Sequence, residues 1–135
     1  MAEDDRFTRG LAIRTEVLGE DYVQRSLANA TDFSRPLQHL VTEYCWGEVW
    51  ARPGLDRRTR SLLNIAMLTA LGHQTELNAH VLGALRNGAT AADVQEVVLQ
   101  AAIYCGIPAA LNAMRTAQAA IAEAASVAES TGVAD

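Results

Sequence analysis

The chain has 135 residues, half of them hydrophobic, and a formal net charge of −5 at pH 7. This length fits a single domain over residues 1–135, with an expected ordered core of about residues 5–128 and a frayed C-terminal tail. The acidic balance argues against a nucleic-acid partner, because phosphates need a basic surface. No window reaches the ~20 apolar residues of a membrane span, and the acidic N-terminus lacks a signal-peptide layout, so a cytoplasmic protein is expected.

Glycine, proline and capping residues recur at spacings typical of helix starts and ends, and no alternating strand pattern is present. The pattern therefore predicts an all-α fold. Gly19, Gly72 and Gly88 mark three helix ends, since glycine readily adopts the left-handed conformation found there. The expected helices span residues 5–18, 20–29, 34–50, 57–71, 76–87, 90–105 and 108–128.

Four helix starts carry a residue that can cap the helix. Ser34, Asp56 and Thr75 each precede a helical segment, and Thr90 with Asp93 has capping-box spacing. The helix after Asp56 is apolar on almost every side. We therefore expect it to be buried on most sides and to meet another subunit along part of its surface.

The two cysteines, Cys45 and Cys105, lie far apart and form neither a CxxC pair nor a metal-binding spacing. We expect them to be two small buried hydrophobic side chains. A disulfide is disfavoured in a reducing cytoplasm.

Three arginines, Arg57, Arg58 and Arg60, stand at the start of the apolar helix. Cations at this end of a helix oppose its dipole, so an anion among them would stabilise the cluster. Guanidinium groups bind carboxylates bidentately, and the free N–H groups of the helix end would assist. The alternative is solvated surface charge.

Glu76 and His80 lie four residues apart on one helix, so their side chains share a face. One interpretation is a general acid, His80, held in orientation by a carboxylate. The other is a first-turn glutamate favoured by the helix dipole beside an ordinary partly buried histidine. No third ligand stands at a matching spacing, so no metal is expected.

Two tryptophans, Trp46 and Trp50, flank Glu48 in a five-residue string. They can line an apolar pocket or serve as core anchors.

Several strings together resemble the carboxymuconolactone decarboxylase family over roughly residues 6–123. The string around the two tryptophans is specific to the decarboxylase branch, whereas the helix pair around His80 is shared by the alkyl hydroperoxide reductase D-like superfamily. The matching strings are Phe7-x-x-Gly10-Leu11-x-x-Arg14-Thr15-Glu16-Val17-Leu18-Gly19, Trp46-Gly47-Glu48-Val49-Trp50-x-Arg52-Pro53-Gly54-Leu55, Thr59-Arg60-Ser61-Leu62, Leu71-Gly72, Glu76-Leu77 with His80, Asn87-Gly88, and Tyr104-Cys105-Gly106-Ile107-Pro108-Ala109.

This resemblance implies a helical subunit in a ring oligomer, usually a hexamer, and a place in protocatechuate catabolism. The implied reaction converts 4-carboxymuconolactone, a small dicarboxylate lactone, to β-ketoadipate enol-lactone and CO2 without a cofactor. The lactone ring can accept the electrons itself, so the protein must hold a dianion, stabilise an oxyanion and protonate a carbon. We expect His80, oriented by Glu76, to be the acid, with Glu48 as its rival. The expected substrate-binding residues are Arg60, Arg57, Trp46 and Trp50.

Two other functions are open. In the thiol peroxidases of the superfamily, the motif Cys-x-x-Cys-x-x-x-His ends at a histidine aligned with His80. His73 and Glu76 stand at the two cysteine positions here, and Ser61 stands where the upstream glutamate would be. Thiolate chemistry therefore has no nucleophile. A helical oligomer that binds or transforms another small organic acid is the second alternative.

Overall fold

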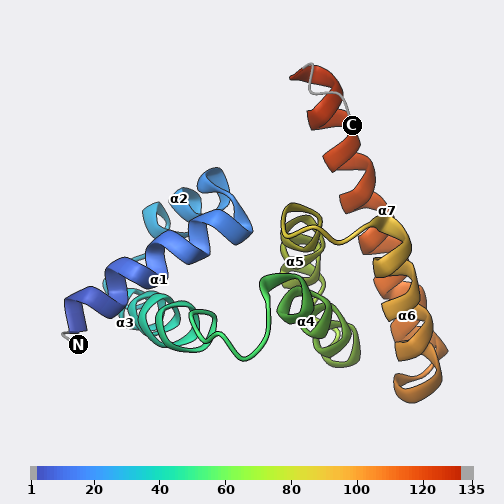
Figure 1. Cartoon of the computed structure of the whole chain (residues 1–135), viewed down its shortest axis with the longest axis horizontal. Coiled ribbons are helices and arrows are strands. Elements are labelled where there is room, and N and C mark those ends of the chain that lie inside the picture. The colour runs from blue at the N-terminus through green and yellow to red at the C-terminus, as the bar shows by residue number, and fades with distance from the viewer. Residues whose placement is uncertain (1–2, 132–135) are drawn as a thin grey trace. The chain divides into compact units, whose positions relative to one another are not determined.

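The computed structural model describes residues 3–131, and every regular element within this range is helical, so the all-α prediction is confirmed (Figure 1). The last helix ends at Ser130, two residues beyond the expected 128, and residues 132–135 of the expected frayed tail lie outside the described range. In chain order the elements are α1 (Glu3–Leu18), α2 (Glu20–Ala28), α3 (Arg35–Leu40), the π-helix η1 (Val41–Val49), α4 (Arg57–Leu71), α5 (Gln74–Arg86), α6 (Ala91–Cys105) and α7 (Ile107–Ser130).

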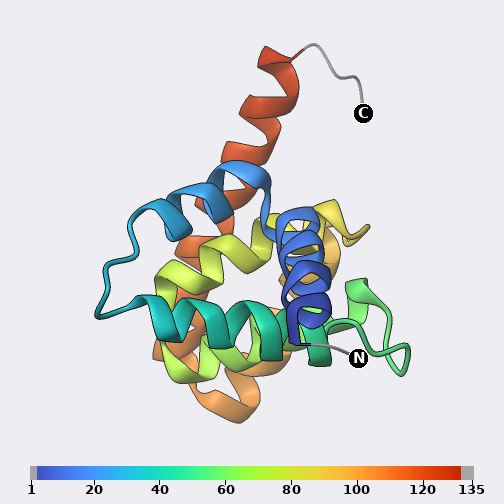
Figure 2. The same cartoon turned by 90° about the vertical axis from the view of Figure 1, so that its left-hand side faces the viewer.

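The chain divides into two compact units, Met1–Arg57 (unit 1) and Arg58–Asp135 (unit 2). In unit 1, α1 packs along η1, while α2 and α3 connect the two (Figure 2). A β-carbon on Gly10 would lie 1.9 Å from the carbonyl oxygen of Thr42, and one on Gly47 would lie 2.3 Å from that of Arg6. The two helices therefore approach backbone to backbone, which only glycine allows at these two positions.

The π-helix is the main departure from the expected elements. One α-helix was expected to run from Ser34 to about Trp50, but α3 ends at Leu40 and the chain continues with wider turns. The backbone N–H of Trp50 bonds to the carbonyl of Cys45, five residues back, at 3.0 Å. A π-helix holds more than four residues per turn, so residues four apart stay on one face. Thr42, Trp46 and Trp50, at this spacing, are all buried.

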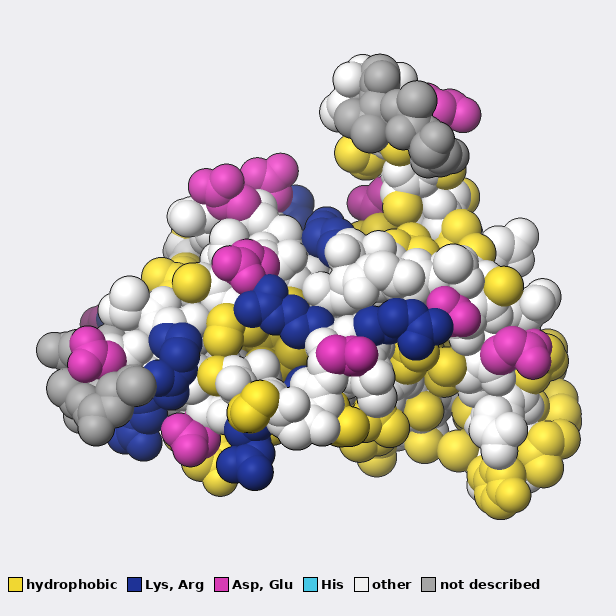
Figure 3. All heavy atoms as spheres, viewed as in Figure 1, with side chains coloured by type: hydrophobic (Ala, Val, Ile, Leu, Met, Phe, Trp, Pro, Cys, Tyr) yellow, Lys and Arg dark blue, Asp and Glu magenta, His cyan; other side chains and the backbone are white. Residues whose placement is uncertain are grey.

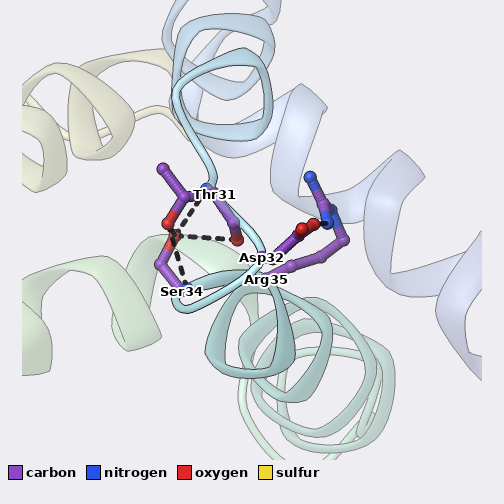
Figure 4. Close-up of polar contacts among 4 residues, drawn as sticks. All are labelled: Thr31, Asp32, Ser34 and Arg35. Carbon is purple, nitrogen blue, oxygen red and sulfur yellow. Dashed lines mark hydrogen bonds and ion pairs between the residues drawn. The ribbon is translucent and has the colours of Figure 1, made fainter.

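Some of the predicted N-caps form in the structure and others do not. Thr90 and Asp93 form the expected capping box, with N–H to oxygen distances of 3.1 and 2.8 Å. Ser34 precedes α3, but its hydroxyl accepts from the N–H of Thr31 instead of from the helix, and Asp32 pairs with Arg35 beside it (Figure 4).

The prediction for Thr75 was wrong, because α5 already begins at Gln74 with His73 as its N-cap. The chain turns after α4 at Gly72, which has φ +75°. Only His73 separates this glycine from the first residue of α5.

In unit 2, α7 lies against both α5 and α6 (Figure 1). Its contact face is a stripe of buried alanines, whose small side chains allow close helix packing. The core that they complete includes Ile65 of α4, Leu77 and Val81 of α5, and Val94 and Val98 of α6.

The prediction that both cysteines are buried was wrong. Cys105 is exposed and Cys45 only partly buried, and both are free thiols. The α4 helix exposes a row of large apolar side chains at Leu63, Met67 and Leu71 in the single chain, and the expected contact of this helix with another subunit stays a prediction. Unit 2 covers a different face of α4, on which Ser61, Ile65 and Thr69 are buried.

The close approach of α1 and η1 leads to a stability prediction. Gly10→Ala should lower the free energy of unfolding by about 3 kcal/mol, because the new methyl group meets backbone atoms that cannot move away as a flexible side chain would. Urea unfolding followed by circular dichroism measures this. Gly54→Ala is the matched control, since a β-carbon at Gly54 meets nothing within 4 Å. Equal stability of both variants would contradict the described packing.

Candidate functional site

Unit 1 holds one group of the expected site residues, on η1. Trp46 and Trp50 are buried, and their rings stack with centroids 4.6 Å apart and planes 26° from parallel. Arg9 of α1 holds the turn between them, because its Nε and Nη2 donate to the carbonyl of Gly47 at 2.9 and 2.6 Å. Glu48 lies between the tryptophans in sequence and is exposed. The stacked tryptophans are therefore part of the core of unit 1, and Glu48 lies outside that core.

Unit 2 holds a separate group, centred on His80 of α5, a partly buried side chain. Its Nδ1 lies 3.4 Å from the side-chain nitrogen of Asn64 on α4. An amide nitrogen can only donate, so Nδ1 accepts, and a neutral ring then carries its proton on Nε2. Burial lowers the pKa of His80 from 6.5 to about 4. The free protein therefore holds a neutral imidazole at pH 7.

Glu76 lies one turn before His80 on α5, as expected, and is exposed. The group that the structure places at Nδ1 is Asn64, which sequence reasoning missed. The available signal was its position one turn after Arg60 within an apolar stretch, where an amide must find a polar partner.

The lowered pKa of His80 predicts how stability depends on pH. The unfolded chain takes up a proton near pH 6.5 and the folded chain near pH 4, so between these values the unfolded state binds more protons. The free energy of unfolding should therefore fall as the pH drops through this window, by up to about 3 kcal/mol. Urea titrations of wild type and His80→Gln from pH 4 to 7 measure the difference.

In the same titrations, His73→Gln serves as the control, since His73 is exposed. It should retain the wild-type slope, whereas His80→Gln should flatten it. Parallel curves for wild type and His80→Gln would mean that His80 is not kept neutral by burial.

The three expected anion-binding arginines have different surroundings. Arg57 pairs with Glu16 at 2.5 Å, and Arg58 pairs with Asp93 at 2.8 Å, so both have a carboxylate partner within the chain. Arg60 is partly buried one turn before Asn64 on α4, and Asn64 contacts His80. This placement favours Arg60 over Arg57 as the substrate-binding cation.

The expected site residues thus fall into two groups. Trp46, Glu48, Trp50 and Arg57 belong to unit 1, where the two tryptophans are in contact. Arg60, Glu76 and His80 belong to unit 2, on the neighbouring helices α4 and α5.

Within residues 3–131, no three histidine, cysteine or acidic side chains gather closely enough to hold a metal ion. None of the helices in that range combines the length and apolar character needed to cross a bilayer.

Comparison with known proteins identifies the family. A 4-carboxymuconolactone decarboxylase from Acinetobacter baylyi is 46% identical over 118 residues, which cover 87% of this chain and 88% of that protein. A nitrosuccinic acid decarboxylase from Metarhizium robertsii is 47% identical over 115 residues, covering 85% and 80% respectively. An uncharacterised 15.0 kDa protein from Paracoccus denitrificans is 37% identical over 85 residues, covering 62% and 63%. The model of the carboxymuconolactone decarboxylase family matches residues 35–119, and this chain belongs to that family.

Proposed function

We propose that this chain decarboxylates 4-carboxymuconolactone to β-ketoadipate enol-lactone and CO2 without a cofactor, as a step of protocatechuate catabolism. The observation that carries the proposal is its 46% identity to a 4-carboxymuconolactone decarboxylase along nearly the whole length of both chains. Arg60 and His80 support it, because they supply a cation for an anionic substrate and a group able to carry a proton, and the string around Trp46 and Trp50 resembles the decarboxylase branch of the family.

The chemistry needs no external electron sink. The leaving carboxylate sits on a carbon conjugated to the lactone carbonyl, so its electrons pass to that oxygen as CO2 departs. The protein must then protonate the carbon next to the carbonyl. His80 is neutral in the free protein, and a bound dianion raises its pKa, so in this proposal the imidazole takes up a proton with the substrate and delivers it to carbon.

The binding groups must stabilise the transition state more than they stabilise the bound substrate. A cation that held the leaving carboxylate would stabilise the substrate more than the transition state. We therefore assign Arg60 to the acetate side chain, whose charge is the same before and after decarboxylation.

A second candidate substrate is nitrosuccinic acid, because the relative named for its decarboxylation is 47% identical. Nitrosuccinic acid also carries two carboxylates, and its nitro group can accept the electrons left by CO2. The two acids therefore require the same kinds of binding and proton-transfer groups, and they differ in shape.

We also propose that the chain forms a homo-oligomeric ring, with a hexamer expected, in the cytoplasm. Apolar side chains gather where α6 meets α7 (Figure 3), and Ile103 and Tyr104 there are about 80% exposed. An apolar groove of about 440 Å³ runs beside them between α4 and α6, lined by Leu62, Leu63 and Val97. Light scattering that showed a stable monomer at micromolar concentration would contradict the ring. The two free thiols agree with a reducing compartment.

The test of the function is a comparison of kcat/KM for the two acids under identical conditions. We expect 4-carboxymuconolactone to be consumed with the higher kcat/KM, followed by loss of its ultraviolet absorbance. Faster turnover of nitrosuccinate would transfer the assignment to the second candidate. No turnover of either acid by a folded protein would overturn both.

A further inference from the structure

Asn64 of α4 is the polar side chain that meets the proposed proton donor, and the proposed reaction gives it no role so far. Its side-chain nitrogen lies 3.4 Å from Nδ1 of His80 on α5. Both side chains are partly buried, so water would compensate only partly for the loss of this contact. The contact joins two helices of unit 2, and it therefore depends on how α4 and α5 lie along one another.

A second amide ties the same two helices together. Nδ2 of Asn87, the C-cap of α5, donates to Oγ of the fully buried Ser61 on α4 at 2.9 Å. Ser61 and Asn64 lie about one turn apart on α4, whereas Asn87 and His80 lie about two turns apart along α5. Two contacts at different heights fix the register of the helices, and this register keeps the ring of His80 at Asn64.

An asparagine amide can serve either charge state of an imidazole. In the free protein the ring of His80 is neutral, and the amide nitrogen of Asn64 donates to its unprotonated Nδ1. Protonation places an N–H at Nδ1, which then needs an acceptor. The amide can supply one by turning over, because its terminal torsion is broad and roughly two-fold, and Oδ1 then takes the place of Nδ2. A carboxylate could only accept, and an apolar side chain could do neither.

We propose that Asn64 is the positioning residue of His80, which holds Nδ1 in both charge states of the ring and so keeps Nε2 as the nitrogen that protonates the substrate carbon. The inference rests on the proposed function for the identity of the reaction. The state of the ring in the free protein can be measured without it.

The protons balance over one turnover. The ring gains one solvent proton as the dianion binds, and it then carries a proton on each nitrogen. Nε2 gives its proton to the carbon next to the lactone carbonyl as CO2 departs, which leaves a neutral ring with its remaining proton on Nδ1, donated to Oδ1 of Asn64. Exchange with water returns the ring to its starting form, so one solvent proton is consumed for each CO2 released.

The first test observes the ring by 15N NMR of the intact, histidine-labelled protein, and His80→Gln identifies the signals by their loss. Without substrate at pH 7, wild type should show an unprotonated Nδ1 and a protonated Nε2. Asn64→Leu, similar in size but unable to form hydrogen bonds, should move both signals toward those of the exposed His73. Asn64→Asp should raise the pKa of His80 well above about 4 and place a proton on Nδ1, since a carboxylate favours the charged ring.

The second test is kinetic and uses 4-carboxymuconolactone. Asn64→Leu should lower kcat roughly 10- to 100-fold, the cost of a misplaced reacting group. KM should change by less than about threefold, because Arg60 still binds the substrate in this proposal. Ser61→Ala is the matched control, since it removes the other contact between the same two helices. It should lower stability but keep the wild-type ring signals and kcat.

Three results would overturn the proposal. The first is a wild-type ring with its proton on Nδ1, and the second is either unchanged ring signals or an unchanged kcat in Asn64→Leu. The third is the same change of ring signals in Ser61→Ala, which would make the effect one of helix packing. A folded protein with the expected ring signals that does not consume the lactone would lose the proposed function and keep Asn64 as the residue that sets the tautomer. An active enzyme whose kcat ignores Asn64→Leu would keep the function and lose this inference.

Discussion

Replacing His80 with glutamine should lower turnover of 4-carboxymuconolactone by roughly 10²–10⁴-fold, the usual contribution of a general acid. The fold should survive, because glutamine is polar and of similar length, and Asn64 can still donate to its side-chain oxygen. Since the ring is neutral in the free protein, the loss should appear in kcat, where the substrate-bound form is measured. Stopped-flow absorbance at saturating substrate gives this value, and circular dichroism confirms the fold.

Two glutamates provide the comparison for His80→Gln. Glu76→Gln should cost less, because Glu76 is exposed and Asn64 is the residue placed at the ring nitrogen. Glu48, exposed beside the stacked tryptophans, is the rival proton donor. Near-full turnover in His80→Gln together with an inactive Glu48→Gln would exchange the two roles.

Arg60→Leu should raise KM about 10- to 100-fold and change kcat by less than about threefold. An ion pair to a carboxylate present in both the ground state and the transition state contributes uniform binding, so its loss appears in KM. A hydrogen bond to a charged group contributes about 1.5–3 kcal/mol, which sets this range. Initial rates over a wide substrate range separate the two constants.

Arg58→Leu is the control for Arg60→Leu, because it removes a cation from the same helix turn whose partner is Asp93. Its KM should stay close to that of wild type. If Arg58→Leu and Arg60→Leu raised KM equally, the effect would be one of overall charge, and the substrate-binding cation would have to be sought elsewhere.

The helices of this protein follow from local signals that do not depend on tertiary contacts. The left-handed glycines at 19, 72 and 88 and the capping box at Thr90 end or begin helices through their own backbone preferences, so they could be predicted. The π-helix could not, because it packs against α1 through the close backbone approach at Gly10 and Gly47. That contact joins positions far apart in the sequence.

In the candidate site, too, the sequence predicts the residues themselves but not their tertiary partners. The string around Trp46 and Trp50 and the pair Glu76–His80 are visible from residue types and spacing. The partners of these groups are not: Asn64 reaches His80 from another helix, and Glu16 reaches Arg57 across 41 positions of the chain. Burial likewise decides that His80 is neutral, and burial is a property of the packed chain.

The most direct measurement of the central claim counts CO2 and lactone together. Metal-free wild-type protein is mixed with 4-carboxymuconolactone in the presence of a chelator, and released CO2 is compared with the lactone consumed. The account predicts one CO2 per lactone at a rate that the chelator does not change, with His80→Gln at least about a hundredfold slower. Lactone loss without CO2, or activity that stops with the chelator and returns with a divalent ion, would contradict it.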